Sequence, residues 1–327
     1  MKRENVVGRA NVEDTPELEK YYRELEGEAL GALWNVANEI EPWYPQPKSV
    51  PTLWKWRRIE PFVRRAPELV SAEKAARRVV MLVNPGRKEW SAAAGLLYTG
   101  VQVMNPGEFT SAHRHQASAL RFIMDGRGAY TTVDGERMSL GARDLVLTPN
   151  GTWHDHGVEA SGTQCVWQDG LDIPLMNSLD ANFYEVHPDV VQKPGKLSRE
   201  NWSKPYSPQF KYAWDEAYAA LKKDGTVHEY CNPLTGGPIM PTIGARLELI
   251  RGATKPKRHT GSVIYQVAEG SGWSEIGGQR FEWEEKDIFA LPSWALHRHG
   301  AHEESVLFSF DDLPAMRALG LYREANS

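Results

Sequence analysis

The chain has 327 residues, of which 41% are hydrophobic and 25% are charged, and its formal net charge is -5 at pH 7. This length and composition suit one large domain or two medium ones and exclude disorder as the default. The acidic balance, without a long basic run, argues against nucleic acid or an anionic membrane as a partner and favours a small ligand. No signal-peptide core and no stretch of about 18 apolar residues is seen. With only Cys165 and Cys231 as cysteines, a cytoplasmic location is expected.

Residues 14–40 have the spacing of an amphipathic helix. Thr15 suits the N-cap position and Pro16 the first helical position, and leucines and aromatic residues follow at helical intervals. Residues 41–60 hold four prolines and three tryptophans, which argues against regular helix and predicts an ordered, extended wrap. Residues 1–76 are therefore expected to form a helical arm followed by this wrap.

From about residue 77 onward the sequence consists of short strand-like runs separated by glycine, proline and asparagine turns, as in an antiparallel barrel or jelly roll. A second series of such strand-like runs and turns follows later in the chain. Residues 113–128 match residues 257–272 at identical spacing, and residues 149–154 match residues 292–297. An internal duplication explains both matches and predicts two barrels in one chain.

The expected organisation is dominated by β structure, with two antiparallel jelly-roll barrels and a helix in the linker between them. The predicted regions are the arm and wrap at 1–76, a catalytic barrel at 77–182, a linker with a helix at 183–230, and a second, degenerate barrel at 231–327.

Three histidines of the first repeat form a candidate metal site. Residues two apart in a strand point to the same face, so His113 and His115 are expected to project together into the barrel. His154 opens a strand roughly forty residues later. Two arbitrary histidines are more often structural, but three at this spacing favour a metal.

The spacing resembles the cupin superfamily, with Gly107 and Gly126 in register, and predicts a bicupin fold. The position that holds glutamate in many cupins is Ala119 in this chain. Three neutral imidazoles leave the charge of a divalent ion uncompensated, which suits a substrate that chelates through a carboxylate and an ortho-phenolate. Imidazole suits Fe(II), and three protein ligands leave about three positions open; zinc and nickel fit the donor set too.

The same-face rule identifies further side chains of the barrel interior. Continuing by twos from the histidine pair reaches Arg121, whose guanidinium fork matches a carboxylate unless it serves in a structural ion pair. Tyr98, Gly100 and Gln102 share one face of an earlier strand. His156, two residues after the last histidine, is expected to face inward either as a catalytic group or as support for a ligand.

Five segments together resemble the gentisate 1,2-dioxygenase and salicylate 1,2-dioxygenase family of bicupin ring-cleaving enzymes. They are residues 51–70, 77–86, 111–136, 147–157 and 167–175. The resemblance implies one Fe(II) per chain on His113, His115 and His154. It also implies a small aromatic acid and O2 as substrates, cleavage between the carboxyl-bearing and the hydroxyl-bearing ring carbons, and a homo-oligomer, a tetramer in this family.

The resemblance further implies that Arg121 and one arginine of the pair Arg77 and Arg78 hold the substrate carboxylate. Arg77 is favoured because it precedes a strand face with Val79 and Met81. His156 and Gln102 would line the reacting face together with Arg121.

Two features leave the ring substituent open. The turn at 149–153 reads PNGTW rather than the bulkier PSWTW type, and Tyr98, beside Gly100, occupies a position that varies in the family. Gentisate, salicylate, chloro- or nitrosalicylate and hydroxynaphthoate all stay open as substrates. The alternatives are another metal-cupin enzyme, such as a 1-hydroxy-2-naphthoate or diketone dioxygenase or an isomerase, and a non-catalytic storage or sensor bicupin.

The second repeat is expected to hold a vestigial site that serves packing. It keeps His259 and His297, but Lys257 takes the first histidine position and Trp294 takes the position of Gly151.

His299 and His302 are expected to belong to the same vestigial site. Asp169 and Asp172, in the run WQDGLDIP, are expected at a strand-end turn and in a subunit contact.

Overall fold

The computed structural model describes residues 15–75, 77–87, 92–192, 204 and 206–326. The chain divides into two compact units, residues 1–46 and residues 47–327. Within the described ranges, none of the helices combines the length and the apolarity that a membrane crossing requires.

The first unit contains two helices, α1 (Pro16–Gly27) and α2 (Leu33–Ile40). The Thr15 hydroxyl accepts a hydrogen bond from the Leu18 N–H at 3.2 Å, so the predicted N-cap is present. The helical spacing of residues 14–40 is divided between two helices, because the backbone between them turns at Ala29, which has a left-handed φ of 57°.

The expected extended wrap is wrong for residues 56–60, which begin helix α3 (Trp56–Leu69); a short helix, α4 (Ala72–Ala75), follows. The Trp56 N–H donates to Asp287 Oδ1 at 2.7 Å, and Lys55 forms a 2.9 Å ion pair with the same carboxylate. Trp56 and Val63 are buried in the core. These tertiary contacts stabilise the first turn and offset the loss of backbone hydrogen bonds at the prolines inside the helix.

Two antiparallel sheets form the first barrel. The spatial order of the six-stranded sheet is β12 (Lys211–Tyr212), β8 (Leu145–Thr148), β5 (Ala119–Asp125), β10 (Cys165–Leu171), β3 (Tyr98–Met104) and β2 (Val79–Met81). The order of the five-stranded sheet is β11 (Tyr184–Val186), β4 (His113–His115), β9 (His154–Val158), β6 (Ala129–Val133) and β7 (Glu136–Leu140). Helix α5 (Ile173–Ser178) follows β10. Met104, Ile123 and Trp167 pack in the apolar core of this barrel.

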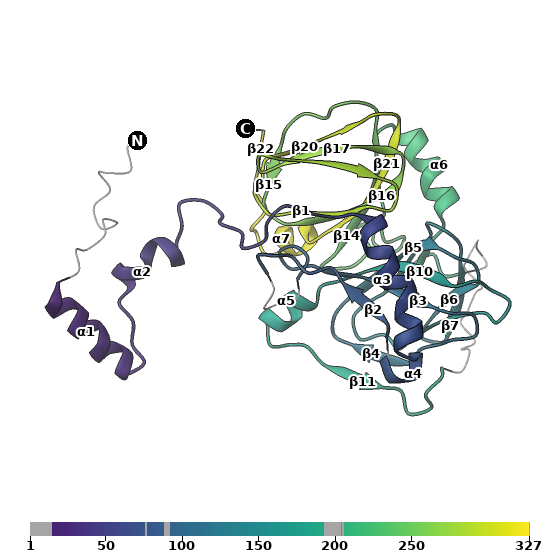
Figure 1. Ribbon diagram of the computed structural model, residues 1–327, viewed down its shortest axis with the longest axis horizontal. Coiled ribbons are helices and arrows are strands. Elements are labelled where there is room, and N and C mark those ends of the chain that lie inside the picture. Colours follow the sequence, from purple (N-terminus) through teal and green to yellow (C-terminus); the bar gives the residue numbers. More distant parts are fainter. Residues whose placement is uncertain (1–14, 76, 88–91, 193–203, 205, 327) are drawn as a thin grey trace. The chain divides into compact units, whose positions relative to one another are not determined.

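The second barrel repeats this arrangement (Figure 1). Its larger sheet has the order β1 (Thr52–Trp54), β19 (Ile288–Leu291), β16 (Val263–Glu269), β21 (Ser305–Asp311), β14 (Gly244–Ile250) and β13 (Val227–Glu229). The smaller sheets are β18 (Gln279–Glu284), β17 (Ser271–Ile276) and β20 (His297–Ala301), and the pair β15 (Arg258–His259) and β22 (Glu324–Ala325). Helix α6 (Trp214–Asp224) lies between the barrels in sequence, and α7 (Leu313–Ala318) follows β21. The predicted two antiparallel barrels with a linker helix are confirmed.

Matching hydrogen bonds in the two barrels support the duplication. The Gly151 N–H donates to the His115 carbonyl at 2.9 Å, and the Trp294 N–H donates to the His259 carbonyl at 2.7 Å. The outer faces of the barrels pack against each other, where the rings of Phe122 and Phe308 stack with centroids 4.0 Å apart. Since Phe122 points outward, its neighbours in β5 point into the barrel.

Candidate metal centre

The three histidines predicted as ligands meet inside the first barrel. His113 and His115 come from β4, and His154 opens β9 directly opposite His113 in the strand pairing. One nitrogen from each ring lies within 4.8 Å of the other two, and all three side chains are buried. The period of two in β4 and the pairing of β4 with β9 together place the three rings.

The hydrogen bonds of these rings leave one nitrogen of each free for a metal. Nδ1 of His113 lies 2.7 Å from the Ser111 carbonyl, Nδ1 of His115 lies 2.7 Å from the Ala117 carbonyl, and Nδ1 of His154 lies 2.9 Å from the Thr152 carbonyl. A carbonyl can only accept, so each Nδ1 carries the proton and each Nε2 keeps its lone pair.

All three Nε2 atoms are buried without a hydrogen-bond partner in the described structure. Burial lowers the pKa of His113 to about 3 and that of His115 to about 4, and it holds the pKa of His154 well below its ordinary value. The rings are therefore neutral donors at physiological pH. Three orphaned, converging lone pairs fit a divalent metal ion, which these residues could hold.

Arg121 lies in the barrel interior, 1% exposed, and pairs with an aspartate that the sequence analysis misplaced. Its Nε lies 3.3 Å from Asp169 Oδ1, and its Nη1 donates to the Thr148 hydroxyl at 3.1 Å. Asp169 is thus not at a strand-end turn or in a subunit contact; it lies within β10, directly opposite Arg121. A buried guanidinium requires a counter-charge, and that requirement was the signal in the sequence for Asp169.

Asp172 is also buried, and its contacts lie within the chain. Its carboxylate accepts from the Ser118 N–H at 2.7 Å and from the Thr242 hydroxyl at 2.5 Å. The expected turn position after β10 is right, but the carboxylate links the two barrels rather than two subunits. No spacing along the chain relates Asp172 to Thr242, because Thr242 belongs to the other barrel.

Gln102 and His156 present unpaired polar atoms to the interior. Both amide atoms of Gln102 are buried and lack a hydrogen-bond partner within the described ranges. Nδ1 of His156 lies 2.8 Å from the Thr131 hydroxyl, while its Nε2 is buried and likewise unpartnered in the described structure. The ring of His156 lies 5.4 Å from that of His154, centroid to centroid, and burial holds its pKa well below the ordinary value. His156 therefore lies beside the three-histidine cluster, not within it.

Gly100 lies in the same row as Asp169 and Arg121, across β3, β10 and β5. A Cβ atom at Gly100 would lie 2.5 Å from Val79 Cγ1 and 3.1 Å from the Tyr98 hydroxyl oxygen. The space that this glycine leaves is thus taken by Val79 and Tyr98, and Gly100 shapes the interior through them. Burial, followed by the charge of Asp169, raises the pKa of Tyr98.

The structure separates the two candidate arginines before β2. Arg78 is buried, donates to the Val70 carbonyl at 3.2 Å and forms an ion pair with Glu108. The charge of Arg77 instead acts on the cluster: after burial, it contributes to the low pKa of both His113 and His115. Of the two, Arg77 is therefore the arginine whose charge acts on these histidines, and its guanidinium lies 6.0 Å from the ring of Tyr184.

Tyr184, which the sequence analysis did not single out, packs directly on the cluster. Its ring stacks on that of His113 with centroids 5.3 Å apart and planes at 25°. It belongs to β11, which pairs with β4 at the edge of the sheet. No spacing rule could have found it, because β11 lies outside the two matched repeats.

The second barrel does not bring together a comparable cluster among the described residues. His259 and His297 lie with ring centroids 5.3 Å apart, and His299 adjoins His297 at 5.7 Å. His302 does not belong to this group: it is exposed and its Nε2 lies 2.9 Å from a Glu282 carboxylate oxygen. His302 follows the end of β20, so the alternation of inward and outward side chains in that strand does not extend to it.

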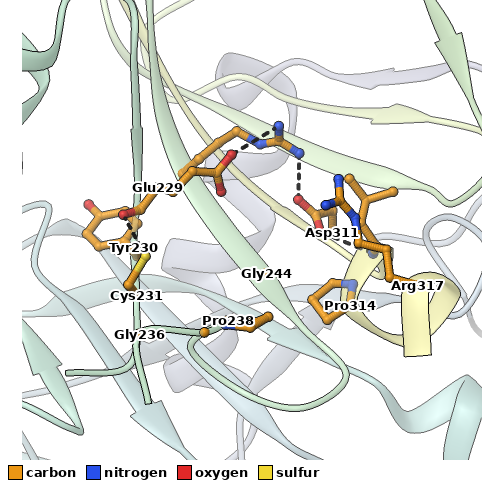
Figure 2. Close-up of a pocket in the computed structure, with 12 residues that line it drawn as sticks. Glu229, Tyr230, Cys231, Gly236, Pro238, Gly244, Asp311, Pro314 and Arg317 are labelled. Atoms are coloured by element: carbon orange, nitrogen blue, oxygen red, sulfur yellow. Dashed lines mark hydrogen bonds and ion pairs between the residues drawn. The ribbon is translucent and has the colours of Figure 1, made fainter. Parts of the chain in front are cut away.

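A partly buried ion-pair network occupies the position in the second barrel that Gly100 has in the first. Arg246, the third residue of β14 as Gly100 is of β3, lies 2.7 Å from Asp311 and 3.6 Å from Glu229. A cavity of about 340 Å³ opens beside it, lined also by Tyr230, Cys231, Pro238, Leu313, Pro314 and Arg317 (Figure 2). None of the histidines lines this cavity.

Known proteins share these features. Residues 100–174 match the Cupin domain family. The chain is 37% identical to gentisate 1,2 dioxygenase 1 of Aquipseudomonas alcaligenes, over 96% of this chain and 97% of that protein. It is 35% identical to 5-aminosalicylate 1,2-dioxygenase of Comamonas sp, over 94% and 90%. A crystal structure of salicylate 1,2-dioxygenase from Pseudoaminobacter salicylatoxidans with gentisate has a TM-score of 0.89 at 30% identity, covering 99% of this chain and 98% of that one.

Proposed function

The chain belongs to the family of gentisate and salicylate 1,2-dioxygenases, as predicted, and we propose that it binds one Fe(II) and opens the ring of an ortho-hydroxybenzoate. The observation that supports this proposal is the set of three unpartnered Nε2 atoms within 4.8 Å of one another, inside a barrel that also buries Arg121. Cleavage would fall between the carboxyl-bearing and the hydroxyl-bearing carbons.

His113, His115 and His154 would hold the iron. When bound, it would supply the redox chemistry between ring and O2, which no side chain of the cluster can supply. The choice of Fe(II) rests on the all-imidazole donor set and on the family. A carboxylate-free set leaves the charge of the ion to be balanced by the substrate, which favours a chelating hydroxybenzoate.

The arginines would bind and orient the substrate carboxylate. Arg121 is held by Asp169 and Thr148, so its guanidinium is fixed before the substrate arrives. Arg77 has no ion pair within the described part of the chain, and its charge is free to be matched by the ligand. A charge-assisted pair with such a fork fixes orientation as well as affinity.

Gln102 and His156 would face the reacting groups. The unpartnered amide of Gln102 can donate to one oxygen of the ligand and accept from another. Gly100 lets Val79 and Tyr98 pack closely, and these residues would shape the wall that the ring substituent meets. His156 is neutral and held by Thr131 through Nδ1; in the tautomer whose Nδ1–H donates to the Thr131 hydroxyl, Nε2 can take the phenolic proton. The burial of Gln102 and His156 would strengthen each of these contacts.

An oxygen-electrode screen tests this function. Anaerobically isolated protein is analysed for iron and then supplied with gentisate, salicylate, aminosalicylate, chloro- and nitrosalicylates and 1-hydroxy-2-naphthoate, with 3-hydroxybenzoate as the control that lacks an ortho hydroxyl. We expect iron-dependent oxygen uptake with at least one ortho-hydroxy acid and none with the control. Iron-loaded protein that consumes no oxygen with any of them would contradict the proposal.

The chain is further proposed to act in the cytoplasm as a homotetramer, with the catalytic barrel at 77–182 and the degenerate one at 231–327. The tetramer is supported by the family and by exposed apolar side chains of α2, including Leu33, Trp34 and Ile40. Light scattering on the purified full chain tests the assembly, since a monomer would contradict it.

A further inference from the structure

The strand β11 covers the strand that carries two of the metal ligands. It pairs antiparallel with β4, placing Tyr184 opposite His115. Directly opposite residues of such a pair point to the same face, so Tyr184 shares the face of the ligands. The strand is held in register by an ion pair of Arg114 with Glu185 at 2.5 Å. The Gln116 N–H also donates to the Phe183 carbonyl at 3.3 Å.

The ring of Tyr184 contacts a metal ligand and faces a substrate-binding candidate. It stacks on the ring of His113, with centroids 5.3 Å apart and planes at 25°, and so limits the rotation of that ring. The Ser111 carbonyl already holds Nδ1 of the same ring. Arg77 Cζ lies 6.0 Å from the Tyr184 centroid, within the range of a cation–π contact. Tyr184 is 49% exposed, so its other face is open to solvent and its hydroxyl does not require a hydrogen-bond partner within the protein.

Arg77 needs such a restraint more than Arg121 does. Arg121 has a buried carboxylate and a hydroxyl to hold it, whereas Arg77 has no ion pair or side-chain hydrogen bond among the described residues. A long side chain without a fixed partner loses rotamer entropy on binding a ligand. An aromatic face beside the guanidinium restricts its rotamers before the ligand binds, and so reduces the entropy lost on binding.

We propose that Tyr184 is a positioning residue, whose ring holds the ligand His113 and the guanidinium of Arg77 in register at the edge of the barrel. The part concerning Arg77 rests on the proposed function, because it assumes a carboxylate ligand. The part concerning His113 requires only that the cluster binds a divalent ion. Outer contacts of this kind set the orientation of a ligand ring and hence metal affinity.

Cobalt(II) and salicylate are suitable probes for the full chain. We expect Tyr184→Ala to weaken Co(II) binding about 10-fold. The absorption of the bound ion is used to measure this affinity. It should also weaken anaerobic salicylate binding to the metal-loaded protein about threefold to fivefold, the size of an exposed cation–π contact. Tyr184→Phe keeps the ring and should retain both affinities. Phe183→Ala, the neighbouring aromatic residue of the same segment, is the matched control and should behave as wild type.

A double variant separates the two contacts. On an Arg77→Ala background, Tyr184→Ala should no longer affect salicylate binding but should still weaken Co(II) binding. Unchanged Co(II) affinity and absorption in Tyr184→Ala would overturn the inference, as would a Tyr184→Phe variant no better than alanine. Tyr184→Leu, which keeps bulk without an aromatic face, serves if the alanine variant is unstable. A wild-type protein that binds Co(II) but not salicylate would count against the proposed function, while the Co(II) comparison would still decide the contact with His113.

Discussion

Asp169 and Arg121 stand directly opposite each other on β10 and β5 and form an ion pair of 3.3 Å inside the first barrel. Both side chains are buried, and burial lowers the pKa of Arg121 to about 10 although the charge of Asp169 opposes the shift. The guanidinium is thus kept in the barrel by a carboxylate of the same chain, and a substrate carboxylate would be a second counter-charge rather than the first.

Replacement of Asp169 by Asn should expose this dependence. Asp169→Asn leaves a buried guanidinium without its counter-charge, so we expect the free energy of unfolding to fall by about 3–5 kcal/mol. The substrate carboxylate then becomes the main counter-charge, and the rise in Tm on adding an ortho-hydroxybenzoate should exceed that of wild type. Calorimetry with and without ligand measures both. Asp180→Asn, at an exposed position, is the control; equal ligand shifts in Asp169→Asn and wild type would argue against the shared role.

Substitution of Arg77 should affect substrate binding, whereas substitution of Arg78 should affect thermal stability. Arg77→Leu is expected to weaken substrate binding about 10-fold or more, the loss of a hydrogen bond to a charged group, with little change in Tm. Arg78→Leu should lower Tm, because it leaves Glu108 without its ion-pair partner, and should leave substrate affinity unchanged. Anaerobic ligand titration and thermal unfolding of both variants test this. The opposite pattern would move the carboxylate site to Arg78.

Metal content should depend on the first barrel alone. His113→Ala removes one of three converging Nε2 atoms, so the purified variant should lose nearly all of its metal. Lys257→Ala, at the matching position of the second barrel, should keep it. Elemental analysis of both proteins, prepared side by side, measures the outcome, and full metal in His113→Ala would show that the ion binds elsewhere.

His156 should affect turnover without affecting metal. Because its Nε2 is free and its ring lies beside the cluster, His156→Ala should keep metal and substrate binding but lower kcat by about 10²–10⁴, the range for a positioned proton-transfer group. Metal analysis, ligand titration and oxygen uptake on one preparation are compared, with His154→Ala as the control that loses metal. Loss of metal in His156→Ala would make it a ligand, and unchanged kcat would make it structural.

The cluster should make the metal-free protein sensitive to acid. The folded-state pKa of His113 is about 3 and that of His115 about 4, below the unfolded value of about 6.5, so the unfolded chain binds protons first as pH falls. Unfolding free energy should therefore be retained in full above pH ~6.5 and decline toward pH ~4, by up to about 1.4 kcal/mol per pH unit for each histidine. Urea unfolding of metal-free protein between pH 7.5 and 5 measures the slope. Metal-free His115→Gln should show a shallower decline; an identical slope would place its origin outside the cluster.

Features that depend on local period or on the internal repeat could be derived from the sequence. The alternation of β4 places His113 and His115 on one face, and the same count along β5 places Arg121 in the interior. The N-cap at Thr15 follows from one residue and its neighbours. The repeat predicts the second barrel and the loss of its first histidine at Lys257. Each of these needs only neighbours in sequence or two aligned copies of one pattern.

Tertiary structure alone decided which distant groups meet. The partner of Arg121 depends on the register of β10 against β5, and a shift by one residue would turn Asp169 outward. Helix α3 begins at Trp56 despite its prolines, because Asp287 of the second barrel binds its first N–H. Tyr184 reaches the cluster only because β11 pairs with β4. Strand register and contacts between barrels are set by the packing of the whole chain, so no local pattern of residues encodes them.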